Sequence, residues 1–269
     1  PGGVWGGVGG QVIQPKRRHV PEGALDLRDF MARQQAEGGG AALKKNKAKE
    51  ELGRRFYLET YGCQMNEADS QIVDSVLRGG GYERVFEAKD ADVVMMNTCA
   101  VREKAEEKIW TRLRQLRGDR HRWGAKAGGR TQVVGVLGCM AERLKEDLLD
   151  EETLVNFIAG PDAYRDLPNL IRAAGGGMQA MNVRLSFEET YSDIEPQRPS
   201  GVEGVSAWLS IMRGCNNMCS FCVVPFTRGR ERSRGLEGIV DEVRRLEEQG
   251  VREVTLLGQN VNSYWDQKW

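Results

Sequence analysis

Three cysteines lie close together near the carboxyl end of the sequence, at Cys215, Cys219 and Cys222. Their spacing, Cys-x3-Cys-x2-Cys, puts three thiols within eight residues, and no fourth cysteine follows. A structural zinc site usually takes four ligands in a closed tetrahedron. Three thiolates instead suit three irons of a [4Fe-4S] cluster, whose fourth iron stays open to an outside ligand. The spacing therefore favours a cluster that binds a cofactor over a zinc knuckle or a disulfide, which needs an oxidising compartment.

The other three cysteines, Cys63, Cys99 and Cys139, are far apart in the sequence but share a position in the local pattern. Each lies one or two residues past the carboxyl end of a short apolar run that is typical of a strand. The carboxyl ends of parallel strands meet at one edge of an open sheet, where ligands gather. We therefore expect three loops to bring these thiols together as a second site. The alternative is that they are small buried apolar residues at strand ends.

The segments around these cysteines alternate between apolar runs and helical periodicity. The runs are FYLETYG, ADVVMMNT, VVGVLG and LVNFIAG. Helices are expected over residues 67–77, after Cys99, over AERLKEDLLD and over residues 164–174, and residues 118–132 are expected to form a polar surface loop. This alternation predicts an α/β fold with an open parallel, Rossmann-like sheet.

Composition bounds the class of protein. The chain has 269 residues, with 39 basic and 39 acidic side chains and about 40% apolar residues, as in globular proteins. A nucleic-acid surface would therefore be a local basic patch. No apolar run approaches the length of a membrane-spanning helix, so no membrane partner is expected.

The chain is expected to divide into four parts. Residues 1–52 are Gly-rich and without core periodicity, which predicts a disordered or targeting tail, the sharper interpretation being a mitochondrial transit segment. Residues 53–175 form the sheet domain, residues 176–204 a linker, and residues 205–269 the start of a second α/β domain. Because the sequence begins with Pro1 and ends at Trp269 just after a strand-like run, we expect a fragment of a longer protein.

The Cys215 segment, RGCNNMCSFC, resembles the signature of radical S-adenosylmethionine (SAM) enzymes. The segments TYGCQMN, NTCAVR and GCMAER are similar to the amino-terminal domain of methylthiotransferases. AGPDAYRDLP, ETYSDI and IMRGCNNMCSFCVVPFTRGRERSR resemble the eukaryotic mitochondrial branch of the MiaB-type tRNA enzymes. The resemblance runs from about Phe56 to the end of the chain.

The resemblance implies a methylthiotransferase amino-terminal domain followed by the first βαβ part of a radical SAM partial (β/α) barrel. It implies two [4Fe-4S] clusters and SAM, which carry the chemistry without a catalytic side chain. The implied reaction converts N6-isopentenyladenosine next to the tRNA anticodon into its 2-methylthio derivative. Implied partners are the anticodon loop and an electron donor of the reductase or ferredoxin type. The implied location is the mitochondrion, with the cytoplasm as the alternative. The implied metal ligands are Cys63, Cys99 and Cys139 for one cluster and Cys215, Cys219 and Cys222 for the other.

Two further groups of residues are candidate sites. For SAM, the resemblance places Phe221 beside the adenine, and the end of a strand offers Gly258, Gln259 and Asn260. For RNA, we expect four arginines at alternate positions to lie on one side of an extended chain. The alternatives are an ordinary strand-to-helix turn for the first group, and a solvated loop or ion pairs within the protein for the second. The arginines are Arg228, Arg230, Arg232 and Arg234.

Three functional alternatives remain at this point. The same chemistry is compatible with threonylcarbamoyladenosine or a ribosomal-protein side chain as the substrate. A non-catalytic, zinc-binding interaction protein with a regulatory partner is the rival class. In addition, the barrel is unfinished, and a short parallel sheet leaves an uncovered edge and apolar face. We therefore expect this chain to bind clusters poorly and to be inactive alone.

Overall fold

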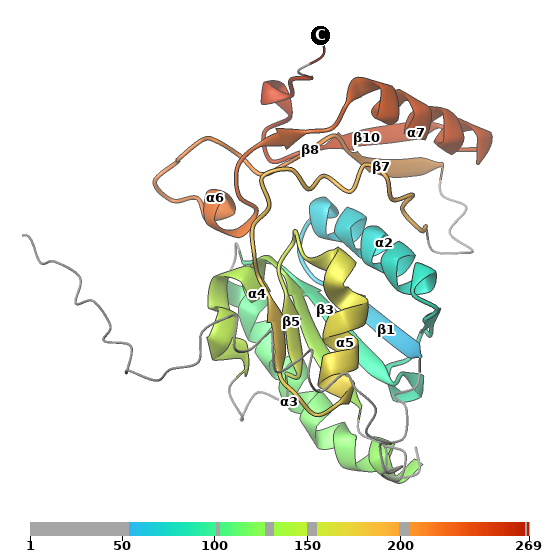
Figure 1. The fold of residues 1–269 in the computed structure, drawn as a ribbon, viewed down its shortest axis with the longest axis vertical. Helices are drawn as coiled ribbons and strands as arrows, with labels where there is room; N and C mark the ends of the chain where they lie inside the picture. The colour runs from blue at the N-terminus through green and yellow to red at the C-terminus, as the bar shows by residue number, and fades with distance from the viewer. Residues whose placement is uncertain are drawn as a thin grey trace, which may run out of the picture. The chain divides into compact units, whose positions relative to one another are not determined.

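The computed structural model describes residues 54–100, 103–126, 132–149, 155–198, 205–266 and residue 268. The predicted tail at residues 1–52 lies outside these ranges. The first part of the described chain is a six-stranded sheet of order β2-β1-β3-β4-β5-β6 in which every neighbouring pair is parallel (Figure 1). Its strands are β1 Arg55–Thr60, β2 Glu83–Arg84, β3 Val93–Thr98, β4 Val133–Gly138, β5 Phe157–Ala159 and β6 Ala180–Asn182.

Apolar residues are buried on both faces of this sheet. In β3, Val93 and Met95 join one core cluster, whereas Val94 and Met96 join the other. This alternation is the period of two that a strand imposes, and burial of both faces is typical of parallel sheets. Helices α2 Gln64–Gly79 and α5 Leu167–Gly175 cover the first face, and α3 Glu103–Lys126 and α4 Cys139–Leu144 cover the second. The predicted open α/β sheet is confirmed.

Helix α3 is longer than the sequence predicts. Its apolar residues Ile109, Leu113 and Leu116 pack on the sheet, and the helix then continues to Lys126. The predicted loop at residues 118–132 is therefore wrong for residues 118–126, while residues 127–131 lie outside the described ranges. Lys and Arg are good helix formers, and a glycine inside a helix costs only about 1 kcal/mol relative to alanine. Gly118 therefore does not end the helix.

Two other elements differ from expectation. The predicted helix AERLKEDLLD is divided into α4 and the 3-10 turn η2 Lys145–Leu149, whose first residue, Lys145, has a φ of +46°. The linker predicted at residues 176–204 contributes β6 to the sheet edge and the buried side chain of Tyr191 to the first core. The remaining short turns are η1 Ala88–Asp90 and η3 Tyr164–Asp166.

The second part of the described chain contains the predicted βαβ unit. Strands β7 Ser206–Ser210 and β10 Glu253–Leu257 are parallel, and α7 Leu236–Glu248 lies between them in sequence. Strands β8 Met212–Arg213 and β9 Arg232–Ser233 form an antiparallel pair, and α6 Val224–Thr227 lies between them in the sequence. The 3-10 turn η4 Val261–Ser263 follows β10. The side chains of Trp208 and Leu256 remain 37% and 47% exposed, so this small sheet is less covered than the first. In the described ranges, no helix has the length and apolar character needed to cross a bilayer.

Candidate functional site

Cys63, Cys99 and Cys139, called the first triad below, lie at the same edge of the six-stranded sheet. Strands β1, β3 and β4 are adjacent and parallel. Cys63 precedes α2, Cys99 directly follows β3, and Cys139 directly follows β4. Thr98 pairs with Gly138 in register, so the chain leaves β3 and β4 at the same level. The three cysteine loops therefore lie at one edge of the sheet, as topology predicts, and the role of the cysteines as ligands remains a prediction.

Two glycines let the neighbouring loops approach Cys99 closely. Gly62 has a φ of +128°, and a Cβ on it would lie 2.7 Å from the Cβ of Cys99. Gly138 has a φ of +86°, and a Cβ on it would lie 2.6 Å from the carbonyl oxygen of Thr98. Both positions exclude a side chain. The loops of the other two cysteines therefore close in on the strand that carries Cys99.

The donor set of the first triad fits an iron–sulfur cluster. Cys99 and Cys139 are buried, Cys63 is exposed, and none of the three is in a disulfide. Within the described ranges, no three Cys, His, Asp or Glu side chains gather tightly enough to hold one metal ion. The thiolates of a cubane bind different irons and stand further apart than the ligands of a single ion. Three cysteines on adjacent loops match in number the three thiolates that hold a cubane with one open iron.

Cys215, Cys219 and Cys222, the second triad, lie on the loop between β8 and α6. Cys215 is buried, Cys222 is half-buried and Cys219 is exposed. The N–H of Cys215 donates to the carbonyl oxygen of Gly229 at 3.1 Å, and the N–H of Asn217 donates to the Sγ of Cys215 at 3.4 Å. The loop is thus held at Cys215 and leaves the other two thiols accessible.

The predicted SAM residues lie at two places near this loop. Phe221 is 90% exposed. Gly258, Gln259 and Asn260 directly follow β10, and a Cβ on Gly258 would lie 2.5 Å from the Cγ of Met212. In the described structure the buried Oε1 of Gln259 has no hydrogen-bond partner. Because buried acceptors are normally satisfied, this oxygen fits a ligand that brings a donor. The roles of these residues remain predictions.

The four arginines predicted to bind RNA do not share one exposed face. Arg228, Arg232 and Arg234 are buried, at 3%, 6% and 5% exposure, and each pairs with a carboxylate inside the protein. Arg230 is exposed, and its guanidinium lies 5.9 Å from the ring centre of Phe187. The prediction is therefore wrong for the three buried arginines. They form ion pairs within the protein, which is the alternative given above.

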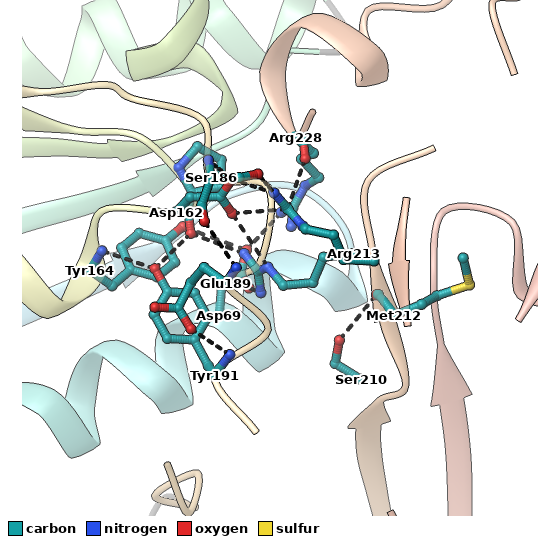
Figure 2. Close-up of polar contacts among 12 residues, drawn as sticks. Asp69, Asp162, Tyr164, Ser186, Glu189, Tyr191, Ser210, Met212, Arg213 and Arg228 are labelled. Carbon is teal, nitrogen blue, oxygen red and sulfur yellow. Dashed lines mark hydrogen bonds and ion pairs between the residues drawn. The ribbon is translucent and has the colours of Figure 1, made fainter. Parts of the chain in front are cut away.

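An ion-pair network joins the first and second parts of the chain (Figure 2). Its cations are Arg213, Arg228 and Arg232. Arg213 Nη1 donates to Asp69 Oδ1 at 2.7 Å, and Arg228 Nη2 donates to Asp69 Oδ2 at 2.7 Å. Arg232 donates to both carboxylate oxygens of Asp162, at 2.8 and 3.1 Å. Such paired contacts fix geometry because a guanidinium is planar. The network therefore sets the position of the second triad's loop against the sheet.

Asp69 stays ionised in this network although it is fully buried. Burial acts to raise the pKa of Asp69, but Arg213 and Arg228 act more strongly in the opposite direction and hold it below its usual value. The ring of Tyr191 supports Arg213, whose guanidinium lies 4.9 Å from the ring centre. The Tyr191 hydroxyl donates to the carbonyl oxygen of Pro161 at 3.0 Å.

Sequence reasoning missed Asp69 although a signal was present. Asp69 lies four residues before Val73 and eight before Leu77, so it shares their face of α2, and all three are buried. An acid on an apolar helical face predicts a buried cation as its partner. The sequence does not say which cation, because Asp69 and Arg213 are 144 residues apart.

Glu142 is a second buried acid that sequence reasoning missed. It lies on α4, is 3% exposed, and its Oε1 is 3.6 Å from the Nζ of Lys145. Its Oε2 has no hydrogen-bond partner in the described part of the chain. Burial raises the pKa of Glu142 to about 7, and Lys145 offsets this only in part.

We expect Glu142→Gln to stabilise the chain at alkaline pH. The pKa of Glu142 in the folded chain, about 7, exceeds the ordinary value of 4.5, so the charge penalty is full above pH 7 and absent below pH 4.5. The expected gain in the free energy of unfolding is about 1–2 kcal/mol at pH 8, since solvent near Lys145 screens part of the charge. Urea unfolding at pH 8 and pH 4 measures this. Equal stabilisation at both pH values would show that the charge is not the cause.

Comparison with known families covers both parts of the chain. Residues 55–160 match UPF0004, an uncharacterized protein family, and residues 209–268 match the radical SAM superfamily. A radical SAM match implies SAM and an iron–sulfur cluster as cofactors, and the second triad lies inside this match. The two parts are called the UPF0004 segment and the radical SAM segment below.

Three curated proteins are similar to most of this chain. The tRNA-2-methylthio-N(6)-dimethylallyladenosine synthase of Chloroherpeton thalassium is 56% identical over 213 residues, which are 79% of this chain and 45% of that protein. The mitochondrial tRNA methylthiotransferase CDK5RAP1 of Homo sapiens is 52% identical over 228 residues, covering 79% and 37%. The CDK5RAP1-like protein of Caenorhabditis elegans is 47% identical over 264 residues, covering 94% and 47%. The chain spans about half the length of such relatives, or less.

A solved structure has a similar fold. It is the radical SAM methyltransferase TsrM of Kitasatospora setae, with a tryptophan substrate and the SAM analog aza-SAM bound. The TM-score is 0.53 at 16% identity, over 78% of this chain and 49% of that chain. At this identity the likeness concerns the fold alone.

Proposed function

We propose that this protein acts as a tRNA methylthiotransferase with two [4Fe-4S] clusters. Its reaction converts N6-isopentenyladenosine next to the anticodon into the 2-methylthio derivative. The observation that carries the proposal is the meeting of three cysteine loops at one edge of the sheet, beside a segment with its own three cysteines. The names of relatives at 52–56% identity support the same reaction.

The side chains in this proposal hold and orient, and the cofactors react. Bound clusters and SAM supply the radical chemistry and the sulfur, which protein side chains lack. The first triad holds one cluster and the second triad the other. Phe221, Gly258, Gln259 and Asn260 hold SAM. The buried ion pairs fix the distance between the two cysteine loops, as a reaction between two bound groups requires.

Arg230 keeps the proposed role in RNA binding. It is exposed and lies over Phe187, which is 76% exposed. A guanidinium and an aromatic ring suit the phosphates and unstacked bases of a single-stranded loop. The anticodon loop, an electron donor of the reductase or ferredoxin type and a mitochondrial location complete the proposal. The location follows the mitochondrial relatives of Homo sapiens, Mus musculus and Rattus norvegicus.

Anaerobic reconstitution with iron and sulfide tests the cofactor content. Both faces of the six-stranded sheet are covered, so we expect the first triad to bind its cluster readily. The second triad lies on a more exposed loop, and we still expect it to bind its cluster poorly. Full loading would give about eight irons per chain, and replacing either triad by alanine should remove about four. A colourless chain that holds zinc would support the rival class, a regulatory interaction protein.

Nucleoside analysis tests the substrate. In tRNA from cells that lack the gene, 2-methylthio-N6-isopentenyladenosine should disappear and N6-isopentenyladenosine should accumulate. Loss of the methylthio group from threonylcarbamoyladenosine or from a ribosomal protein, with this nucleoside unchanged, would assign one of the rival substrates instead.

A further inference from the structure

Arg228 belongs to the radical SAM segment but lies beside the first triad. It directly follows α6, which packs against α4, the helix that begins with Cys139. Its Nη2 donates to the Oδ1 of Asn66 at 3.1 Å, and the thiol of Cys63 lies 3.8 Å from the same oxygen. Arg228 therefore reaches the loops of two cysteines that the other segment carries.

One nitrogen of the Arg228 guanidinium lacks a hydrogen-bond partner among the described residues. Nη2 binds Asp69 and Asn66, whereas the buried Nη1 has no hydrogen-bond partner in the described part of the chain. Buried donors are rarely left without an acceptor. Arg228 directly follows α6, which packs against the helix that begins with Cys139, so this donor lies on the side of the radical SAM segment that faces α4.

The ion-paired arginines of the network outnumber its aspartates. Arg213, Arg228 and Arg232 pair with Asp69 and Asp162, and Asp162 also interacts with the buried acid Glu142. A cluster ligated by three thiolates is anionic and would place further negative charge beside α4, against which α6 packs. The unpartnered donor of Arg228 therefore belongs to a cationic group that an anionic cluster would stabilise.

We propose that Arg228 donates a hydrogen bond from Nη1 to a sulfur of the cluster held by the first triad and raises its reduction potential. The inference rests on the proposed function, because it needs that cluster. Uptake of one electron makes the cluster more negative by one charge, and a nearby guanidinium stabilises the more negative form. Arg228 is a positioning and tuning residue. Packing of the radical SAM segment against the sheet then sets the reduction potential of the cluster held by the first triad.

The test isolates the first cluster. In a chain with Cys215, Cys219 and Cys222 replaced by alanine, the cluster is reconstituted, and its potential is measured by redox titration with dithionite followed by electron paramagnetic resonance. Arg228→Gln should lower the ratio of reduced to oxidised cluster at a fixed potential at least about tenfold, which equals about 59 mV for one electron. Arg228→Lys keeps the charge but loses the forked donor, so a smaller decrease is expected.

Arg234→Gln is the matched control. The side chains of Arg228 and Arg234 are 4% and 5% exposed, and each binds a buried carboxylate. Arg234 binds Glu242 of its own segment, so its loss should destabilise the chain and leave the potential unchanged. The same shift in this control would overturn the inference by showing a general effect of losing a buried ion pair.

The remaining outcomes separate the inference from the proposed function. A full complement of about four irons with an unchanged potential in Arg228→Gln would overturn the inference alone. Failure of the background chain to bind iron at all would overturn the proposed function with it. If Arg228→Gln does not fold, Arg228→Lys decides, because an unchanged potential there also contradicts the proposed hydrogen bond.

Discussion

Replacing Asp69 by Asn is expected to lower the free energy of unfolding by about 3–5 kcal/mol. The change leaves the guanidinium groups of Arg213 and Arg228 buried without their shared carboxylate. All three side chains are 4% exposed or less, so water screens the lost interaction only weakly. Chemical denaturation at pH 7 measures the effect.

Asp241→Asn is the control for this change. Asp241 pairs with Arg244 at 2.9 Å, but these side chains are 57% and 69% exposed. Exposed ion pairs contribute little, so the expected change is below about 1 kcal/mol. Equal losses in the two variants would contradict the assignment of Asp69 to a buried network.

The effect of Asp69→Asn should depend on pH in one direction. The pKa of Asp69 is held below the ordinary value of 3.8, so the native carboxylate contributes fully above about pH 4. Its contribution is lost as pH falls through the lower pKa of the folded state. The difference between the native chain and the variant should therefore be constant from pH 7 to pH 5 and shrink below pH 3.8.

Replacing Gly214 by Ala is expected to distort the loop of the second triad. Gly214 has a φ of +72°, and a Cβ on it would overlap the carbonyl oxygen of Arg230. The backbone strain and the overlap together should cost about 2–5 kcal/mol. Because Cys215 follows directly, its buried thiol should also become more reactive. Unfolding by urea and the rate of thiol labelling at Cys215 measure both effects.

Gly238→Ala is the matched control. Gly238 lies on α7, and among the described residues nothing lies within 4 Å of a Cβ built there. The same substitution should stabilise the chain by about 0.5–1 kcal/mol, because alanine is a better helix former. If Gly214→Ala unfolds at the same urea concentration as the native chain, the left-handed backbone at Gly214 is not required.

Local pattern was sufficient to predict the sheet and the edge at which the three cysteine loops lie. The runs at Val93–Thr98 and Val133–Gly138 are buried on both faces, so they are mostly apolar and easy to recognise. Chain order then places the loops after them at one edge, since parallel strands share a direction. Neither inference needs a long-range contact between side chains.

The arginines were misjudged because their partners are remote. The spacing of Arg228 and Arg232 says where they lie along the chain, but Asp69 and Asp162 are 159 and 70 residues away. The end of α3 was misplaced for a different reason. Gly118 and Gly124 suggest a loop, whereas the helix continues through both because each glycine costs it only modestly. Pair contacts and helix ends depend on tertiary packing, which local pattern does not contain.

The segment predicted as a linker has a consequence for how the two parts can be exchanged. It adds β6 to the sheet edge through pairing with β5, and it inserts Tyr191 between the first core and Arg213. A chimera joined at residue 176 would lose both and expose β5 as a new edge. Recombination between relatives should therefore succeed only when the crossover lies beyond residue 198. The sheet then keeps β6 as its edge strand and Tyr191 against Arg213.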